Sequence, residues 1–434
     1  MSLQKRKQDA TWSGTIKDWI PLSWRTWEGD VNRDETEPLT DGDGERQKAH
    51  GDRAGDADLT SIVVSECSTS EEGQPMLVFS LCRVPDPAEI PPPRLLEALR
   101  LRLEETVTRD GSYSVVLFLD PAPFVPSLRD LVSTYFALSA VAKKKVEHVY
   151  LVGGGWKTSL LVRLFSTSIL SFKAIQKGKL VDCSTLSLLA ERLGPETFTR
   201  IEIPLEVYIS NAKREPSLQF DEEVAPPSPA ESQAPLVQDC LKILAEQGPS
   251  SLGIFRRSPS AAKVAHLEAA YRRGHPVRLD LAPDAPYLAA SLLKRHLARR
   301  VEPVFSRAVC DEARRCPLAI EEEHKDAVAF IRESILPLVS EANNPLLVEF
   351  VRVLAQIATN ASQNLMTAEN LVICVCPALV GGIGGSVEEV GMFRVPGMDV
   401  GTMRGGLWKE EARVSENTVG GVLKVMIERH DRVF

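Results

Sequence analysis

The stretch Gly253-Ile254-Phe255-Arg256-Arg257-Ser258 places two arginines directly after a glycine and two apolar residues. Two interpretations compete, because a motif of six residues has little specificity alone. In the first, the stretch is a helix start whose arginines are solvated. In the second, a rigid turn holds one arginine so that its guanidinium enters another protein's active site and stabilises negative charge on a phosphoryl group. The surrounding sequence has to decide between them.

The sequence that follows has the periodicity of helices. Asn344-Pro345 predicts a helix start, with asparagine as the N-cap and proline at the first helical position. Beyond it, one wide apolar face recurs at helical spacing, formed by Leu346, Leu347, Phe350, Val351, Leu354 and Ala358. Thr367 is expected to cap a following buried helix, which Pro377 is expected to end. A closing helix is outlined by Val422, Leu423, Met426 and Ile427, and the region reads as all-helical because nothing in it alternates with period two.

The region from about Pro235 to Phe434 resembles the RhoGAP family, helical domains that activate GTP hydrolysis by Rho-type GTPases. The motifs that carry the resemblance occur in the family's order. They are the turn Gly253 to Ser258, then Leu292-Leu293-Lys294, then Asn364-Leu365-Met366-Thr367, and finally Asn370-Leu371 followed by a proline. This ordered succession is much more specific than any single motif.

The resemblance implies that Arg256 is the catalytic arginine finger. It implies that Lys294, Arg257 and Arg299 contact a Rho-family GTPase in its GTP-bound state, with no cofactor, no metal and no reaction of the chain's own. The cluster of basic residues around Lys294 is either a solvated face or a basic strip that favours approach to phosphates and acidic switch loops. Its members are Lys294, Arg295, His296, Arg299 and Arg300.

Two positions depart from the family pattern. The arginine that the family usually has one turn after the lysine is Ala298 here, and Arg299 points roughly 100° away from that position. The family's Pro-Asn-Leu is Pro377-Ala378-Leu379. Hydrogen bonds to charged groups contribute about 1.5–3 kcal/mol each, so losing two predicts weak activity. The alternative function is therefore a GTPase- or lipid-binding scaffold with little catalysis.

Residues 59–212 have a different pattern, in which short apolar runs alternate with helical ones. The runs Met76 to Leu81, Val115 to Leu119 and Val149 to Val152 predict strands of a parallel α/β layer. A glycine-rich stretch, Gly153 to Thr158, follows the last of them. It lacks the glycine that a phosphate-binding loop needs before its lysine and has Trp156 there, so nucleotide binding is not expected.

The same region resembles the divergent CRAL-TRIO fold, also called the BCH domain. The resemblance rests on Pro75 to Ser80 with Cys82-Arg83, on Val149 to Val152, and on Leu170 to Lys173 leading into Gln176-Lys177. It implies binding to anionic or prenyl lipids or to prenylated GTPases. Lys173 and Lys177 are candidate lipid contacts, as is the run 143–145, although a solvated loop explains these lysines equally well.

Composition and length fit this organisation. The chain has 434 residues and a net charge of −8, which argues against general nucleic-acid binding. Its eight cysteines show no paired metal-binding spacing, and it has no long apolar segment, so we expect a cytoplasmic protein, peripheral at membranes at most. The predicted boundaries are a disordered tail at 1–58, a Pro-rich acidic linker at 213–234, and a Gly-rich insertion at 381–415 inside the RhoGAP-like region 235–434.

Overall fold

The computed structural model describes residues 56–69, 73–153, 179–216, 218, 235–318, 325–381 and 417–434. The predicted tail therefore lies almost wholly outside the described residues, except that 56–58 belong to a helix and not to the tail. The insertion at 381–415, apart from Gly381, and most of the linker at 213–234 also lie outside them.

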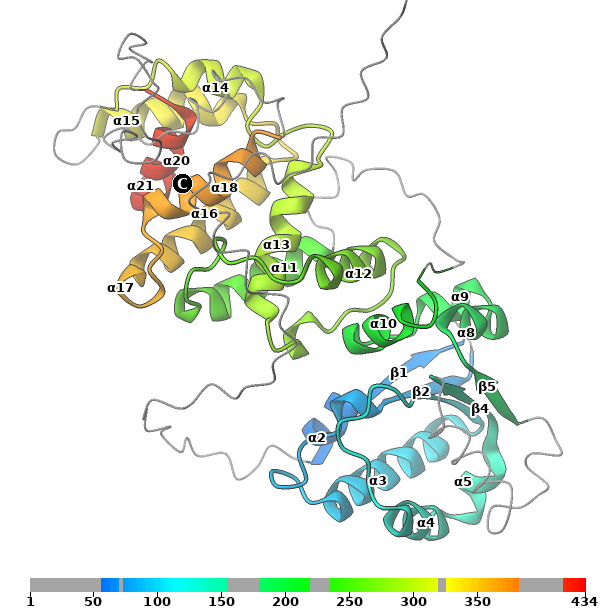
Figure 1. The fold of residues 1–434 in the computed structure, drawn as a ribbon. Coiled ribbons are helices and arrows are strands. Elements are labelled where there is room, and N and C mark those ends of the chain that lie inside the picture. The colour runs from blue at the N-terminus through cyan, green and yellow to red at the C-terminus, as the bar shows by residue number, and fades with distance from the viewer. Residues whose placement is uncertain are drawn as a thin grey trace, which may run out of the picture. The chain divides into compact units, whose positions relative to one another are not determined.

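The described residues before 219 form an α/β structure around a five-stranded sheet (Figure 1). The strands lie in sequence order: β1 (Val64–Ser68), β2 (Pro75–Ser80), β3 (Tyr113–Phe118), β4 (Val146–Val152) and β5 (Leu180–Cys183). β1 pairs antiparallel with β2, and the other three pairings are parallel. The predicted parallel α/β layer is therefore confirmed, and β1 and β5 are additions to it.

Helices cover both faces of this sheet. Successive side chains in a strand point to opposite faces, so the apolar strands contribute to a separate core on each face. One face includes Val78, Val116 and Val152 and packs against Leu186, Phe198 and Tyr208. The other includes Leu77 and Val115 and packs against Leu95, Val107 and Ala142. The helices are α2 (Asp56–Val63), η2 (Leu81–Arg83), α3 (Pro92–Asp110), α4 (Leu128–Ala137), α5 (Ala140–Lys145), α8 (Leu186–Leu193), α9 (Pro195–Thr199) and α10 (Leu205–Ala212).

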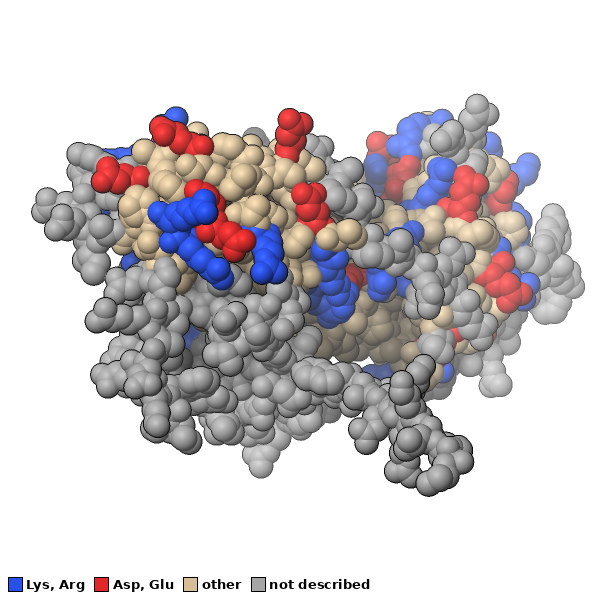
Figure 2. Space-filling view, turned by 90° about the horizontal axis from the view of Figure 1, so that it is seen from above, with Lys and Arg blue, Asp and Glu red and all other residues tan. Residues whose placement is uncertain are grey.

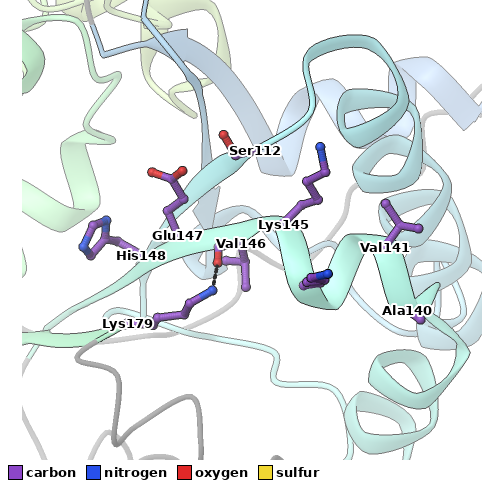
Figure 3. A pocket seen from close by; sticks show the side chains of 9 residues that line it. Ser112, Ala140, Val141, Lys145, Val146, Glu147, His148 and Lys179 are labelled. Atoms are coloured by element: carbon purple, nitrogen blue, oxygen red, sulfur yellow. Dashed lines mark hydrogen bonds between the residues drawn. The ribbon is translucent and has the colours of Figure 1, made fainter.

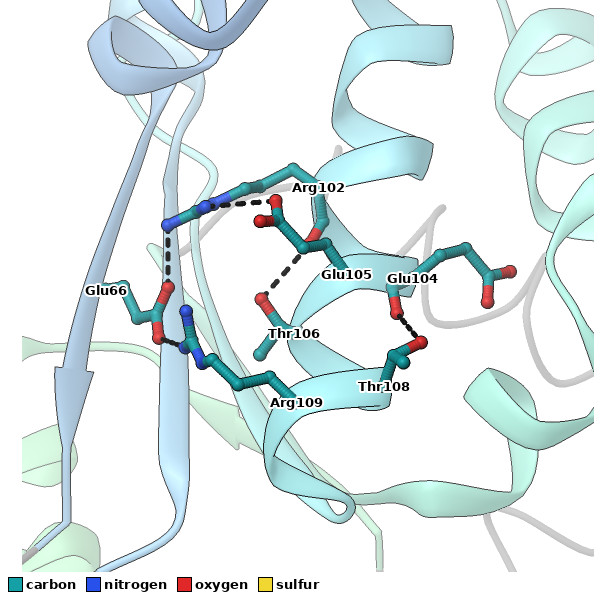
Figure 4. Close-up of polar contacts among 7 residues, drawn as sticks. All are labelled: Glu66, Arg102, Glu104, Glu105, Thr106, Thr108 and Arg109. Carbon is teal, nitrogen blue, oxygen red and sulfur yellow. Dashed lines mark hydrogen bonds and ion pairs between the residues drawn. The ribbon is translucent and has the colours of Figure 1, made fainter.

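A polar network fixes the edge strand β1 to α3 (Figure 4). Glu66 on β1 accepts hydrogen bonds from Arg102, at 2.8 Å, and from Arg109. Arg102 also donates to Glu105 on its own helix at 3.2 Å. One part-buried carboxylate thus holds two guanidiniums that lie seven residues apart on one face of α3, a network in which ion pairs contribute more than isolated surface pairs do.

The described residues from 235 onward are helical and contain no strand. The elements are α11 (Pro235–Gln247), η4 (Gly248–Ser250), α12 (Ala261–Arg272), η5 (Leu279–Leu281), α13 (Ala285–Ala298), α14 (Arg307–Ala313), α15 (Lys325–Phe330), the π-helical turn η7 (Ile331–Ile335), η8 (Leu336–Leu338), α16 (Asn344–Thr359), α17 (Ala361–Asn364), α18 (Ala368–Leu379), α20 (Val419–Glu428) and α21 (His430–Val433). Helix α11 packs against α13, and α20 packs against both α16 and α18. The predicted apolar face of α16 lies in this core, with Phe350, Leu354 and Ile357 fully buried.

Two predicted helix ends need correction. Asn344 is the first residue of α16 and Asn343 is its N-cap, although proline does stand in the first turn as predicted. Pro377 does not end α18, which continues to Leu379. Proline clashes with the turn before it, so it disfavours a helix N-terminal to itself more than the one or two residues that follow. The predicted cap is confirmed, because the Thr367 hydroxyl accepts the Asn370 N–H.

Figure 2 shows part of the charged surface. On the face drawn there, lysine and arginine side chains lie next to aspartate and glutamate side chains and do not form one broad basic field. Among the described residues, no helix is both long and apolar enough to cross a membrane.

Candidate functional site

The turn Gly253–Ser258 is anchored by apolar side chains and presents polar ones. Ile254 and Phe255 are 0 % and 1 % exposed, whereas Arg256 and Arg257 are both exposed. The Phe255 ring packs edge-on against Phe350 of α16, with ring centroids 6.0 Å apart. These residues do not begin a helix. They form a turn whose apolar side chains are buried in the core and whose two arginines are exposed.

The backbone of this turn is in an unusual conformation. Gly253 and Phe255 both have a φ of 65°, in the left-handed region that aromatic residues rarely adopt. A side chain at Gly253 would meet Arg257 at 3.3 Å. The N–H groups of Arg256 and Arg257 both donate to the Gly253 carbonyl, at 3.0 and 2.9 Å. Glycine adopts this conformation readily, whereas at a residue such as Phe255 it costs about 1–3 kcal/mol, and such residues cluster at functional sites.

Asn364 ties the turn to the helices behind it. Its side chain is completely buried, and its amide donates to the carbonyls of Ile357, at 2.8 Å, and Pro249, at 3.0 Å. Its side-chain oxygen accepts the Met366 N–H at 2.8 Å. Its backbone carbonyl accepts the Gly253 N–H, also at 2.8 Å. The motif Asn364 to Thr367 is thus a structural clamp beneath the arginine turn.

Lys294 supports the turn from α13. Its ammonium donates to the carbonyl oxygen of Phe255 at 2.7 Å, one peptide away from Arg256. Burial lowers the pKa of Lys294. Arg256 is the next residue after Phe255, so it lies close to this ammonium. Burial raises the pKa of the Cys374 thiol, and the positive charges of Lys294 and Arg256 oppose that rise. The structure therefore brings together Arg256 and Lys294, two residues that the sequence places 38 positions apart.

Arg257 is turned toward the protein itself. Its guanidinium lies over the Tyr287 ring, 5.2 Å from the centroid, and donates to the Tyr287 hydroxyl at 3.4 Å. That hydroxyl in turn donates to the Leu252 carbonyl at 2.9 Å. Arg257 therefore helps to brace the turn from its own side, which supports Arg256 as the presented arginine.

The basic residues that follow Lys294 do not form one exposed strip. Arg295 and Arg299 both pair with Glu268 on α12, and Arg299 is exposed. His296 and Arg300 are buried, and Arg300 donates to the Asn343 side chain at 2.7 Å. The five basic residues therefore do not form a continuous basic strip. At helical spacing they lie on different faces, and two of the five are buried in the core.

The two positions that depart from the family pattern differ in environment. Ala298 is exposed and is the last residue of α13. Ala378 is 7 % exposed, inside the last turn of α18. Lys173 and Lys177, the candidate lipid contacts, lie outside the described residues. All eight cysteines are free thiols.

His296 makes the helical region sensitive to acid. Burial, and next the charge of Arg300, lower its pKa to about 4 from an ordinary value of 6.5. The unfolded chain binds this proton more tightly than the folded chain does. The contribution of His296 to the free energy of unfolding is therefore fully present above pH 6.5, and about 3 kcal/mol of it is lost as the pH falls to 4. Burial also lowers the pKa of His275 to about 4, so we expect His296→Gln to reduce, and not abolish, the fall in the free energy of unfolding between pH 6.5 and 4 in urea titrations. Equal slopes for wild type and His296→Gln would refute the assignment.

Comparison with known proteins agrees with this geometry. Residues 234–382 match the family model described as the RhoGAP domain, and these residues form a RhoGAP domain. The chain is 25% identical over 353 residues to human Rho GTPase-activating protein 1, covering 73% of this chain and 75% of that one. It is 26% identical over 341 residues to mouse Rho GTPase-activating protein 8, covering 71% and 76%. Both matches are longer than the stretch from 235 to the C-terminus, so they extend into the α/β region.

Among solved structures, the chain is similar to the crystal structure of the BH domain from GRAF, the GTPase regulator associated with focal adhesion kinase. The identity is 18%, the TM-score is 0.36, and the match covers 48% of this chain and 97% of that one.

Proposed function

We propose that this chain is a GTPase-activating protein for Rho-family small GTPases, with Arg256 as its arginine finger. The observation that carries the proposal is the mounting of Arg256, an exposed arginine next to a buried aromatic anchor, on a turn clamped by Lys294 and Asn364. Rigid mounting matters because electrostatic stabilisation of a transition state depends on groups already in place when the charge develops.

The chain supplies this group to a reaction that belongs to its partner. The GTP-bound GTPase carries the nucleotide, and Arg256 enters to stabilise the negative charge that develops on the transferred phosphoryl group. Lys294, Arg257 and the exposed Arg299 lie beside the turn or on the helix next to it and are the proposed contacts with the GTPase. The chain itself has no separate reaction to catalyse and requires no cofactor for this role.

Single-turnover hydrolysis of GTP by a panel of Rho GTPases, with and without this protein, tests the proposal. Stimulation of at least one member by a hundredfold or more supports it. If no member is stimulated although at least one is bound in its GTP state, the scaffold function is the correct one.

The scaffold function has specific support at Ala298 and Arg299. The family's arginine is missing at 298, and Glu268 holds both Arg295 and Arg299 against α12, so neither replaces it freely. Because Ala298 is exposed at the end of α13, an arginine fits there without repacking. Ala298→Arg is therefore expected to raise the stimulated rate by about tenfold, the equivalent of one charged hydrogen bond. Ala298→Gln, which has a similar length but no charge, serves as the control, and an unchanged rate in both variants would show that this position does not limit activity.

We further propose that the α/β region is a CRAL-TRIO-like domain of the BCH type that binds anionic or prenyl lipid or a prenylated GTPase. Its support is the mostly parallel sheet with helices on both faces, which precedes the RhoGAP domain in the chain and is included in the matches to the two relatives. This role places the protein in the cytoplasm and at membrane surfaces where prenylated GTPases reside.

A further inference from the structure

The corner between α4 and α5, residues 136–145, exposes apolar side chains to an unusual degree. Phe136 is 56 % exposed and Val141 is 55 % exposed. Ala137 and Ala140, which lie between them in the chain, are exposed as well. Single exposed apolar residues are ordinary, but a group of them rimmed by polar residues is typical of an interaction surface.

Lysines border this α4–α5 corner. Next to Val141 opens a pocket of about 920 Å³ whose lining includes Lys144, Lys145 and Lys179 (Figure 3). The three come from two places in the chain, the end of α5 and the residue before β5. Lys143, also on α5, has its ammonium 6.0 Å from the centroid of the Phe136 ring.

The lysines divide into two pairs by their contacts. Lys143 donates to the Phe136 carbonyl at 3.0 Å and Lys179 donates to the Val146 carbonyl, so this pair fixes the backbone of the corner. Lys144 and Lys145 are exposed and make no hydrogen bond or ion pair with another described residue. Lys144 and Lys145 therefore do not cap the C-terminal carbonyls of α5, and their ammonium groups are available to a partner.

Lysines outnumber carboxylates at the corner, where the four lysines face Glu147 and Glu104, and Glu104 accepts hydrogen bonds from the N–H and hydroxyl of Ser139 at 2.6 and 2.7 Å. The one carboxylate in the pocket lining is Glu147, which accepts a hydrogen bond from Gln74 at 3.0 Å. The net charge of the whole chain is −8. An excess of lysines at this corner favours an anionic partner there, even though the chain as a whole is acidic.

We propose that the α4–α5 corner docks on the surface of a bilayer that contains anionic phospholipids. Phe136 and Val141 enter the interface between headgroups and acyl chains, and Lys144 and Lys145 meet the lipid phosphates. The combination of an apolar tip with a basic rim fits a bilayer, in which apolar and anionic layers lie a few ångströms apart. The proposal rests on the lipid-binding role proposed for the α/β region and assigns that role to this corner, so vesicle binding that survives the corner substitutions would overturn the assignment and leave the lipid role standing.

Sedimentation of the full-length protein with vesicles tests the proposal. We expect binding to phosphatidylcholine vesicles that contain about 30% phosphatidylserine, no binding to pure phosphatidylcholine, and weakening as salt is raised. Each lysine at an anionic surface changes the partition coefficient by about fivefold, so Lys144→Glu/Lys145→Glu should lower it by at least about twentyfold. Phe136→Ser/Val141→Ser should lower it by about tenfold.

Matched variants on other surfaces serve as controls. Lys213→Glu/Lys242→Glu makes the same charge change at two exposed lysines, and Val301→Ser removes an apolar side chain that is 69 % exposed. Both should bind vesicles as the wild type does. The proposal is overturned if the corner variants bind like the wild type while remaining folded by circular dichroism, or if the controls lose as much binding as they do. It is also overturned if the protein binds inositol hexakisphosphate through Lys144 and Lys145 but no vesicle, which would make the pocket a site for a soluble anion.

Discussion

Arg256→Ala is expected to reduce the stimulated rate of GTP hydrolysis by roughly a thousandfold or more, the range attributed to an arginine finger. The reason is geometric. The turn buries Phe255 and directs Arg256 outward, so the substitution removes a guanidinium without disturbing the buried anchor. Single-turnover hydrolysis at saturating GTPase measures the effect, and the affinity for the GTP-bound GTPase should change far less than the rate.

Arg257→Ala is the matched control for this prediction. Its guanidinium lies on Tyr287 and braces the turn, so we expect a loss of no more than about tenfold. Arg256→Lys should remain close to Arg256→Ala, because an ammonium lacks the planar, multidentate geometry of a guanidinium. Equal losses in Arg256→Ala and Arg257→Ala, with both variants folded, would show that the finger has been assigned to the wrong residue.

The sequence predicted a candidate finger but not the contacts that hold its turn. The motif Gly253 to Ser258, through its resemblance to the family's turn, predicted Arg256 as the finger, and this stays a prediction that the substitutions above test. The hydrogen bond from Lys294 to Phe255 was not predictable from spacing. It joins residues 39 positions apart, and it depends on how α13 packs against the turn.

The sheet shows the same limit. The three central strands were visible as apolar runs with β-branched or aromatic residues, because much of each strand is buried. Strand β1 has the sequence Val-Ser-Glu-Cys-Ser and is only half-buried, and β5 is four residues long, so neither produces a clear pattern. An edge strand is stabilised largely by contacts with neighbouring elements, which its own sequence does not reveal. Glu66 on β1 pairs with Arg102 and Arg109 of α3, and this pairing is apparent only in the structure (Figure 4).

Asn364→Ala is expected to cost about 3 kcal/mol of stability and to lower the stimulated rate by a further ten- to hundredfold in the fraction that remains folded. The stability term arises because the side chain satisfies three buried backbone groups, those of Pro249, Ile357 and Met366. Leaving a buried donor or acceptor unpaired costs about 1–3 kcal/mol, and partial relaxation of the turn keeps the total below the sum. Urea unfolding measures this part.

The activity term has a separate cause. The Asn364 carbonyl holds the Gly253 N–H, so a shift of the Asn364 turn moves the base of the finger, and a misplacement of about 1 Å can cost a hundredfold in rate. Rates should be compared at low temperature, after correction for the folded fraction. Gln363→Ala, at an exposed position in the same turn, should leave stability and rate close to wild type. If the corrected rate of Asn364→Ala equals that of wild type, Asn364 stabilises the domain without positioning the finger, and Lys294 alone carries that role.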